Sequence, residues 1–257
     1  MNKVDLNLPI RAGTTVIGPL SILRMKSEEA VQLVRTSVQL RYPLEIAICN
    51  AHTTLTAIDD PAFAKTLQQM TLLNDGIGID LASRFLNGKD FPDNLNGTDL
   101  IPDILANVGI PLRIFLLGAT EHRVKLASEH IEATYPLHEV VGYRNGYFDM
   151  DQSAAICDEI NRTRPDLLLV GMGNPRQEDF IVQNRPELDA TVAIGVGALF
   201  DFMSGSVIRA PKAVQAVGLE WLFRLLQEPR RLFHRYVVGI PRFFAALVKL
   251  KRAGRDA

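Results

Sequence analysis

Asp75 is the residue whose setting in this sequence most strongly indicates chemistry. It lies in the stretch LLNDGIGIDL, residues 72–81, where Asn74 and Gly76 separate it from apolar runs on both sides. Carboxylates avoid protein interiors unless they are paired or hydrogen-bonded. Asp75 is therefore either a turn residue at the surface or a chemical group at the floor of a cleft. In a cleft, partial loss of solvent would raise its proton affinity and suit it to act as a base.

Glycine-containing loops follow three predicted buried strands, at residues 117–120, 170–175 and 194–198. In open parallel sheets, ligands bind beyond the carboxyl ends of the strands. Gly118, Gly173 and Gly197 would let a ligand approach the backbone, and free N–H groups at a helix start attract phosphate. Any one loop can instead be a tight turn without a ligand, but three on one sheet edge favour a nucleotide-sized anion. None contains a complete GxGxxG or Walker motif, so neither a dinucleotide nor a triphosphate is indicated.

Other polar residues have both a structural and a functional interpretation. Arg176 and Gln177 either belong to a capped helix start or contact hydroxyls and phosphates at the mouth of a cleft. Asp201 either caps a turn or accepts hydrogen bonds from a base or sugar. Asp149 and Asp151 have a spacing that can hold a divalent ion against a diphosphate. Because a predicted helix follows directly, we favour capping of that helix over metal binding.

The elements that would position these residues alternate along the chain. Continuous apolar runs predict buried strands at residues 45–50, 112–117, 166–170 and 191–196. Periodic segments predict helices from residue 27, near residues 81–86, and at residues 61–73, 98–109, 121–134, 151–162 and 176–183. Apolar strands separated by helices indicate an α/β fold, with a mainly parallel, Rossmann-like sheet covered by helices on both faces.

The C-terminal region differs from the rest in charge and pattern. Residues 209–257 contain eleven Lys and Arg against three Asp and Glu, a net charge of +8, whereas residues 1–208 carry −9. Short helices, cut by Pro229 and Pro241, are predicted at residues 218–227, 229–238 and 241–252. Basic residues interleaved with aromatic ones indicate an amphipathic appendage that binds an anionic membrane surface. Each basic residue near anionic lipid contributes roughly 1 kcal/mol of attraction. A nucleic-acid patch and a solvated face are the alternatives, and the aromatic residues argue against a solvated face.

Composition excludes several classes of protein. Cys49 and Cys157 are the two cysteines, with no CxxC pair, which argues against a disulfide scaffold or a structural zinc site and fits a reducing compartment. There is no run of about eighteen apolar residues that would span a bilayer. Because residues 1–20 lack the apolar region of a secretory signal, we expect a cytoplasmic location.

A series of short motifs, in family order from about residue 46 to residue 236, resembles the WecG/TagA/CpsF glycosyltransferases (glycosyltransferase family 26). The motifs are Asn50, Asp75-Gly76, Gly97-Thr-Asp99-Leu100, Asn174-Pro-Arg-Gln177-Glu178, Gly195-Val-Gly197, Arg209-Ala-Pro211 and Gly218-Leu-Glu-Trp221. The resemblance implies inverting transfer of a sugar from a UDP-sugar onto an undecaprenyl-diphosphate-linked saccharide at the inner face of the cell membrane. Such transfers build exopolysaccharide, capsule, teichoic acid or common antigen.

The resemblance also assigns roles to residues, and it implies neither a metal nor another cofactor. It implies that Asp75 is the general base and that Asn50 lies beside it in the pocket. Gln177 would contact the sugar, and Asp201 would belong to the nucleotide pocket. Arg224 and Arg231 of the appendage would contact the diphosphate. The chain then divides into a core, residues 1–208, and a basic appendage, residues 209–257, that docks peripherally at the membrane and completes the site.

This sequence departs from the family pattern at two positions. Ile48 stands where the family often has Thr, and Asn94 stands where it often has Arg. Both positions bear on sugar or acceptor contacts, so N-acetylmannosamine, its uronic acid and glucose all stay open as the donated sugar. A nicotinamide-dependent oxidoreductase and a non-catalytic membrane adaptor are the alternative functions. No nucleic-acid partner is expected, and self-association into a homo-oligomer is left open.

Overall fold

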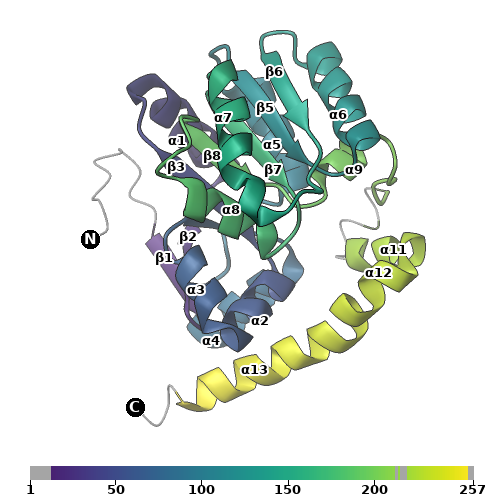
Figure 1. Ribbon diagram of the computed structural model, residues 1–257. Helices are drawn as coiled ribbons and strands as arrows, with labels where there is room; N and C mark the ends of the chain where they lie inside the picture. Colours follow the sequence, from purple (N-terminus) through teal and green to yellow (C-terminus); the bar gives the residue numbers. More distant parts are fainter. Residues whose placement is uncertain (1–12, 212–213, 215–218, 254–257) are drawn as a thin grey trace.

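A six-stranded, all-parallel sheet forms the centre of the fold (Figure 1). The computed structural model describes residues 13–211, 214 and 219–253, so the expectations for residues 1–12, for Gly218 and for residues 254–257 lie outside it. The strand order is β4-β3-β8-β7-β5-β6. The strands are β3 (Leu44–Cys49), β4 (Thr71–Asn74), β5 (Arg113–Gly118), β6 (Glu139–Arg144), β7 (Leu167–Gly171) and β8 (Val192–Gly195). The predicted α/β class with a parallel sheet is confirmed.

Helices cover both faces of this sheet, and each face has its own hydrophobic core. On one face the buried side chains come from α2 (Ala51–Asp59), α3 (Pro61–Leu67), α4 (Ile77–Asn87), α7 (Ser153–Thr163) and α8 (Arg176–Asn184). On the other face they come from α1 (Ser27–Leu40), α5 (Gly97–Asn107), α6 (Glu121–Thr134) and α9 (Leu199–Met203). The strands are buried on both faces, which is why their sequences are almost wholly apolar.

The helix predicted over residues 61–73 is wrong in its second half. Helix α3 ends at Leu67, and residues 71–74 form β4, which pairs with β3 so that Ile48 lies opposite Leu73. Two adjacent leucines are too short a run to distinguish a strand from a buried helix by periodicity. The consequence for function is direct, because Asp75 now follows the carboxyl end of a strand in the sheet.

Helices α2 and α9 were not predicted, and neither were three further features in the first part of the chain and near the sheet edge. Strands β1 (Gly13–Ile17) and β2 (Leu20–Arg24) form an antiparallel hairpin that packs beside β4. Strand β6 adds the outer edge of the main sheet. A single 3-10 turn, η1 (Met150–Gln152), precedes α7. These three features extend the core without contributing to the predicted site.

The C-terminal helices are more continuous than predicted. After α11 (Glu220–Gln227), the segments α12 (Pro229–Phe233), η2 (His234–Val238) and α13 (Gly239–Ala253) follow one another without a break. Pro241 lies in the first turn of α13, where its missing N–H is tolerated. The residue four positions earlier, Val237, belongs to the π-helical segment η2, so the ordinary α-helical hydrogen-bond pattern is already interrupted before Pro241.

Helix α13 runs along the base of the molecule, beneath α2 and α4 (Figure 1). Its buried residues Phe243 and Leu247 join the same hydrophobic core as α2 and α4. Within the described residues, no helix combines the length and the apolar character needed to cross a bilayer.

Candidate active site

Asp75 and Asn50 lie side by side at the carboxyl ends of the neighbouring strands β4 and β3. The Asn50 side chain caps α2 through its Oδ1, which accepts from the N–H groups of His52 and Thr53 at 3.0 and 3.1 Å. This fixes the amide so that its Nδ2 donates to Asp75 Oδ2 at 3.2 Å. The Asp75 N–H donates to the Cys49 carbonyl at 2.9 Å, which extends the strand pairing by one residue. The carboxylate is thus held by a helix cap and by the sheet.

Two glycines set the direction of the chain after Asp75. Gly76 has a φ of +80°, and its N–H donates to Asn94 Oδ1 at 2.8 Å. Asn94 is one of the two departures from the family pattern, and it holds the turn that follows Asp75. At Gly78 a Cβ would lie 3.0 Å from the Ala51 Cβ, so the first turns of α4 and α2 are in close contact. This close approach brings Asp75 and Asn50 together.

Asp75 is half-buried, and its partial loss of solvent raises the pKa of the carboxyl above the ordinary value. The Asn50 hydrogen bond and the positive charges of Arg235 and Arg224 act in the opposite direction, while Asp99 adds to the increase. The net shift is upward, as a carboxylate that accepts a proton near neutral pH requires.

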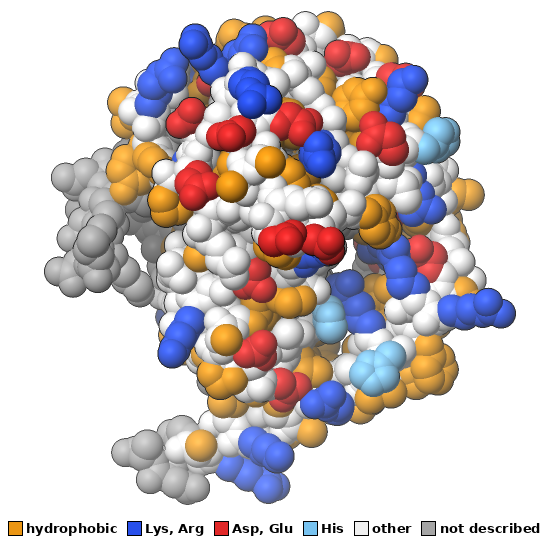
Figure 2. Space-filling model, in the orientation of Figure 1, with side chains coloured by type: hydrophobic (Ala, Val, Ile, Leu, Met, Phe, Trp, Pro, Cys, Tyr) orange, Lys and Arg blue, Asp and Glu red, His pale blue; other side chains and the backbone are white. Residues whose placement is uncertain are grey.

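Arg235 is the cation of the C-terminal helices that acts most strongly on Asp75, and it was not predicted. It lies in η2, where burial lowers the pKa of its guanidinium. Burial together with the charges of Arg235 and His234 also lowers the pKa of His52 to about 4, so His52 is neutral near pH 7. Figure 2 shows Lys, Arg and His side chains gathered where the surface is hollowed between the sheet domain and the C-terminal helices.

Asp201 pairs with arginines from two different parts of the chain. Its Oδ1 lies 2.8 Å from Nη1 of Arg123 on α6, and its Oδ2 lies 3.4 Å from Nη1 of Arg231 on α12. Arg231 also pairs with Glu228 at 2.8 Å. The structure therefore brings the predicted Asp201 and Arg231 together. Arg123 is the third member of this group, and it carried no signal in the sequence because it lies on an ordinary charged helix.

Arg224 and Arg209 link the C-terminal helices to the core. The Arg224 guanidinium lies 4.9 Å from the ring centroid of Phe202 on α9. Arg209 pairs with Asp99 at 2.5 Å and with Glu220 at 3.6 Å. Arg224 does not contact Asp75 directly, and its influence on that carboxylate is electrostatic.

Gln177 joins two of the glycine loops. Its side chain is buried, and its Oε1 accepts from the N–H groups of Gly173 and Gly197 at 3.1 and 3.0 Å. These two N–H groups are therefore not free, which differs from the expectation for a phosphate-binding loop. No heavy atom lies within 4 Å of where a Cβ of either glycine would stand, so the backbone at both positions borders open space.

Glu178 completes this network beneath the loops. Its Oε1 accepts from Gln177 Nε2 at 2.8 Å and from Asn174 Nδ2, while its Oε2 is buried without a hydrogen-bond partner. Burial raises the pKa of this carboxyl to about 7. A sequence search for ligand contacts overlooks Glu178 because its role is to hold Gln177 and Asn174.

The other predicted site residues have mainly structural contacts. A side chain at Gly118 would overlap the Gly171 carbonyl, so this glycine allows two strands to approach closely. Arg176 donates to the Phe148 carbonyl, and its guanidinium lies 4.9 Å from the Phe148 ring centroid.

Asp149 stands at the N-cap of η1, but its side chain makes no cap hydrogen bond, so the predicted capping by Asp149 is wrong. Among the described residues, no group of three or more His, Cys, Asp or Glu could hold a metal.

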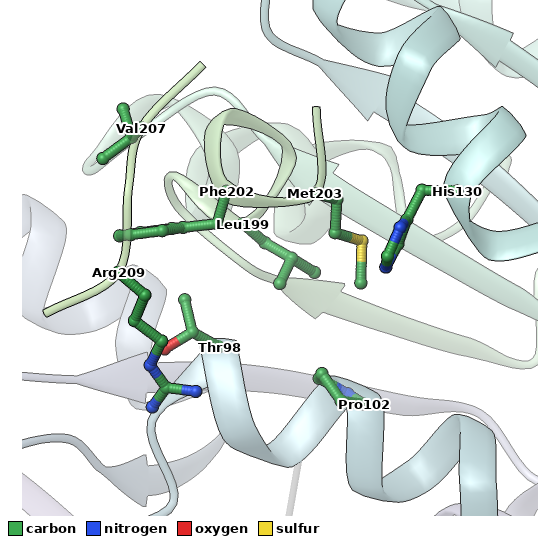
Figure 3. Close-up of a pocket in the computed structure, with 8 residues that line it drawn as sticks. All are labelled: Thr98, Pro102, His130, Leu199, Phe202, Met203, Val207 and Arg209. Atoms are coloured by element: carbon green, nitrogen blue, oxygen red, sulfur yellow. The ribbon is translucent and has the colours of Figure 1, made fainter. Parts of the chain in front are cut away.

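A small cavity lies between α5, α6 and α9 (Figure 3). Its volume is about 210 Å³, and it is lined by Thr98, Pro102, His130, Leu199, Phe202, Met203, Val207 and Arg209. Pockets for small-molecule ligands usually start at about 300 Å³. We therefore assign no substrate to it.

The pattern of the WecG/TagA/CpsF glycosyl transferase family matches residues 15–257. The chain belongs to this family. It is similar to the N-acetylglucosaminyldiphosphoundecaprenol N-acetyl-beta-D-mannosaminyltransferase of Bacillus spizizenii strain W23, with 32% identity over 210 residues, 81% of this chain and 80% of that protein. A Staphylococcus aureus (strain MW2) protein of the same name is 28% identical over 216 residues, 83% of each chain.

Membership of the family identifies the chain as a glycosyltransferase and argues against both the oxidoreductase and the adaptor. The candidate site has three parts: the Asp75–Asn50 pair, the loops joined by Gln177, and the arginines of the C-terminal helices. The sequence resemblance pointed to each part. It did not indicate that Arg235 is the arginine with the strongest effect on the carboxylate.

Proposed function

We propose that this glycosyltransferase transfers a hexose, with inversion, from a UDP-sugar to an undecaprenyl-diphosphate-linked saccharide in the synthesis of a cell-surface polysaccharide. The names of the two relatives support the class of acceptor. They also make UDP-N-acetylmannosamine the first donor to test. The proposal includes no metal and no other cofactor.

The observation that carries this proposal is the Asp75 carboxylate, held by Asn50 and with Arg235 and Arg224 acting on it electrostatically. Asp75 takes the proton of the acceptor hydroxyl as that oxygen attacks the anomeric carbon. The bond from this carbon to the UDP oxygen breaks, and the electron pair leaves with the diphosphate. A single base and a stabilised leaving group are sufficient for a single displacement.

The donor nucleotide is proposed to bind along the edge formed by the glycine loops. Gly173 and Gly197 border open space there, and Gln177 holds both loops in place. The Asp201–Arg231 pair supplies a carboxylate and a guanidinium, the groups that bind hydroxyls and phosphates. Arg224 and Arg235 are proposed to face the diphosphate of the UDP-sugar donor.

The C-terminal helices are proposed to hold the enzyme on the anionic inner face of the cell membrane. Their exposed apolar side chains include Leu219, Leu222, Leu226 and Phe233. Arg224 lies on α11, and Arg230 and Arg231 lie on α12. Apolar contact combined with attraction to anionic lipid is the usual basis of interfacial binding.

The test of the proposed reaction is Asp75→Asn, assayed for UDP release and for lipid-linked product by mass spectrometry with a panel of UDP-sugars. The loss of a general base should lower kcat by about 10²- to 10⁴-fold. UDP-sugar binding, measured by calorimetry, should persist. Asp158→Asn, which changes an exposed carboxylate on α7, is the control and should keep full activity. Near-normal turnover by Asp75→Asn would eliminate the proposed mechanism.

A further inference from the structure

Helix α4 carries a row of exposed apolar side chains. Ile77, Leu81 and Phe85 are four residues apart, so they lie on one face of the helix, with exposed fractions of 50%, 39% and 40%. The opposite face packs into the core through Ile79 and Ala82. Large apolar side chains gathered on an exposed face mark a site of contact with a ligand or partner.

Helix α13 adds a second row next to the first. Phe244 and Val248 are each 39% exposed, and Lys251 follows one turn later. The Lys251 ammonium lies 4.0 Å from the ring centroid of Phe85 and donates to the Phe85 carbonyl. The two rows therefore meet at this contact. We call the five apolar residues of the two rows the α4/α13 face.

The α4/α13 face begins at the proposed catalytic base. Ile77 is two residues after Asp75, and the row from Ile77 to Phe85 extends for about 12 Å along the helix. Arg235, which acts electrostatically on Asp75, precedes α13 by four residues. A lipid-linked acceptor whose saccharide hydroxyl reaches Asp75 carries its hydrocarbon chain away from the reacting atoms, and the exposed apolar row that starts at Ile77 lies next to this carboxylate.

We propose that the α4/α13 face binds the polyprenyl chain of the acceptor. The inference rests on the proposed function and adds the hydrocarbon chain to the parts of the substrate that the enzyme recognises. Bilayer lipid is the other candidate occupant. The continuity of the face with Asp75 favours the substrate chain, because the acceptor has to reach Asp75 for transfer and bulk lipid does not.

Calorimetric binding of farnesyl diphosphate and of inorganic diphosphate, without any bilayer, tests the proposal independently of turnover. The full chain should bind farnesyl diphosphate about tenfold more tightly than diphosphate. Leu81→Ser and Phe85→Ser should each remove most of this difference and leave diphosphate binding unchanged. Leu40→Ser, at a 70% exposed leucine at the end of α1, is the matched control. Equal binding of the two ligands by the unaltered chain overturns the proposal.

Kinetics distinguish the substrate chain from the bilayer. With two acceptors that share one saccharide-diphosphate head, Leu81→Ser should raise KM about tenfold for the prenyl-linked acceptor and leave KM unchanged for a short alkyl analogue. Loss of vesicle flotation by Leu81→Ser with both KM values unchanged would assign the face to the bilayer and overturn the proposal. Prenyl-dependent binding without transfer to either acceptor would support this inference and contradict the proposed function.

Discussion

The acid–base behaviour of Asp75 is decided by a few neighbouring groups. Burial raises its pKa, while the Asn50 amide and the Arg235 charge lower it. Activity should therefore fall as the pH decreases through a pKa above the ordinary aspartate value of about 4. Arg235→Gln removes a positive charge, so the acid limb of kcat/KM should move to higher pH, whereas Arg235→Lys should keep it nearly in place. If the acid limb of the kcat/KM profile of Arg235→Gln lay at the wild-type pH, Arg235 would not act on the base.

Glu178 gives a second prediction at the scale of single residues, in protein stability. Its folded pKa is raised from 4.5 to about 7, so its stabilising contribution is complete below pH 4.5 and is lost as the pH rises through about 7. Glu178→Gln is neutral at every pH. Between about pH 5 and about pH 8, the wild type should lose up to about 3 kcal/mol of unfolding free energy relative to this variant. Urea unfolding measures the difference, and the exposed Glu129→Gln should retain the wild-type pH dependence.

At the scale of elements, the loop edge depends on close contact between β5 and β7. Gly118 has a φ of +149°, and a Cβ there would overlap the Gly171 carbonyl. Gly118→Ala should therefore cost about 3 kcal/mol or more of unfolding free energy. Gly205 has a φ of +71° but open space around it, so Gly205→Ala should cost only about 1 kcal/mol. Thermal unfolding of both variants tests this explanation, which similar losses would contradict.

At the scale of the whole molecule, the C-terminal helices are fixed to the core and also present an outer apolar surface. Phe243 and Leu247 are buried in the core, while Arg242 pairs with Asp59 at 2.9 Å. The exposed ion pair contributes at most about 1 kcal/mol, so the buried side chains supply most of the attachment.

Membrane binding is the corresponding prediction. Leu222 and Leu226 on α11 are 38% and 74% exposed, so replacing both with Ser should leave the melting temperature nearly unchanged. The fraction of protein that floats with anionic vesicles should decrease about tenfold or more. A double variant at Leu40 and Leu137, which lie outside the C-terminal helices, controls for exposed leucines in general. Equal flotation of the two double variants would place the membrane contact elsewhere.

The sequence alone predicted the parallel α/β fold and the basic C-terminal region, and it indicated Asp75, Asn50 and Asp201 as candidate site residues. These features depend on apolar periodicity and on short local motifs, which are present in the linear chain. The helix over residues 61–73 was wrong because the strand β4 is defined by pairing with β3, a contact between distant segments.

The tertiary structure decided which groups act on one another. Only the folded position of η2 lets the charge of Arg235 act on Asp75, and only the folded loops place Gln177 between Gly173 and Gly197. Electrostatic shifts and hydrogen bonds depend on distance and solvent exclusion in three dimensions, and sequence separation contains little information about either. The sequence therefore determined which chemical groups are available, and the fold determined which of them meet.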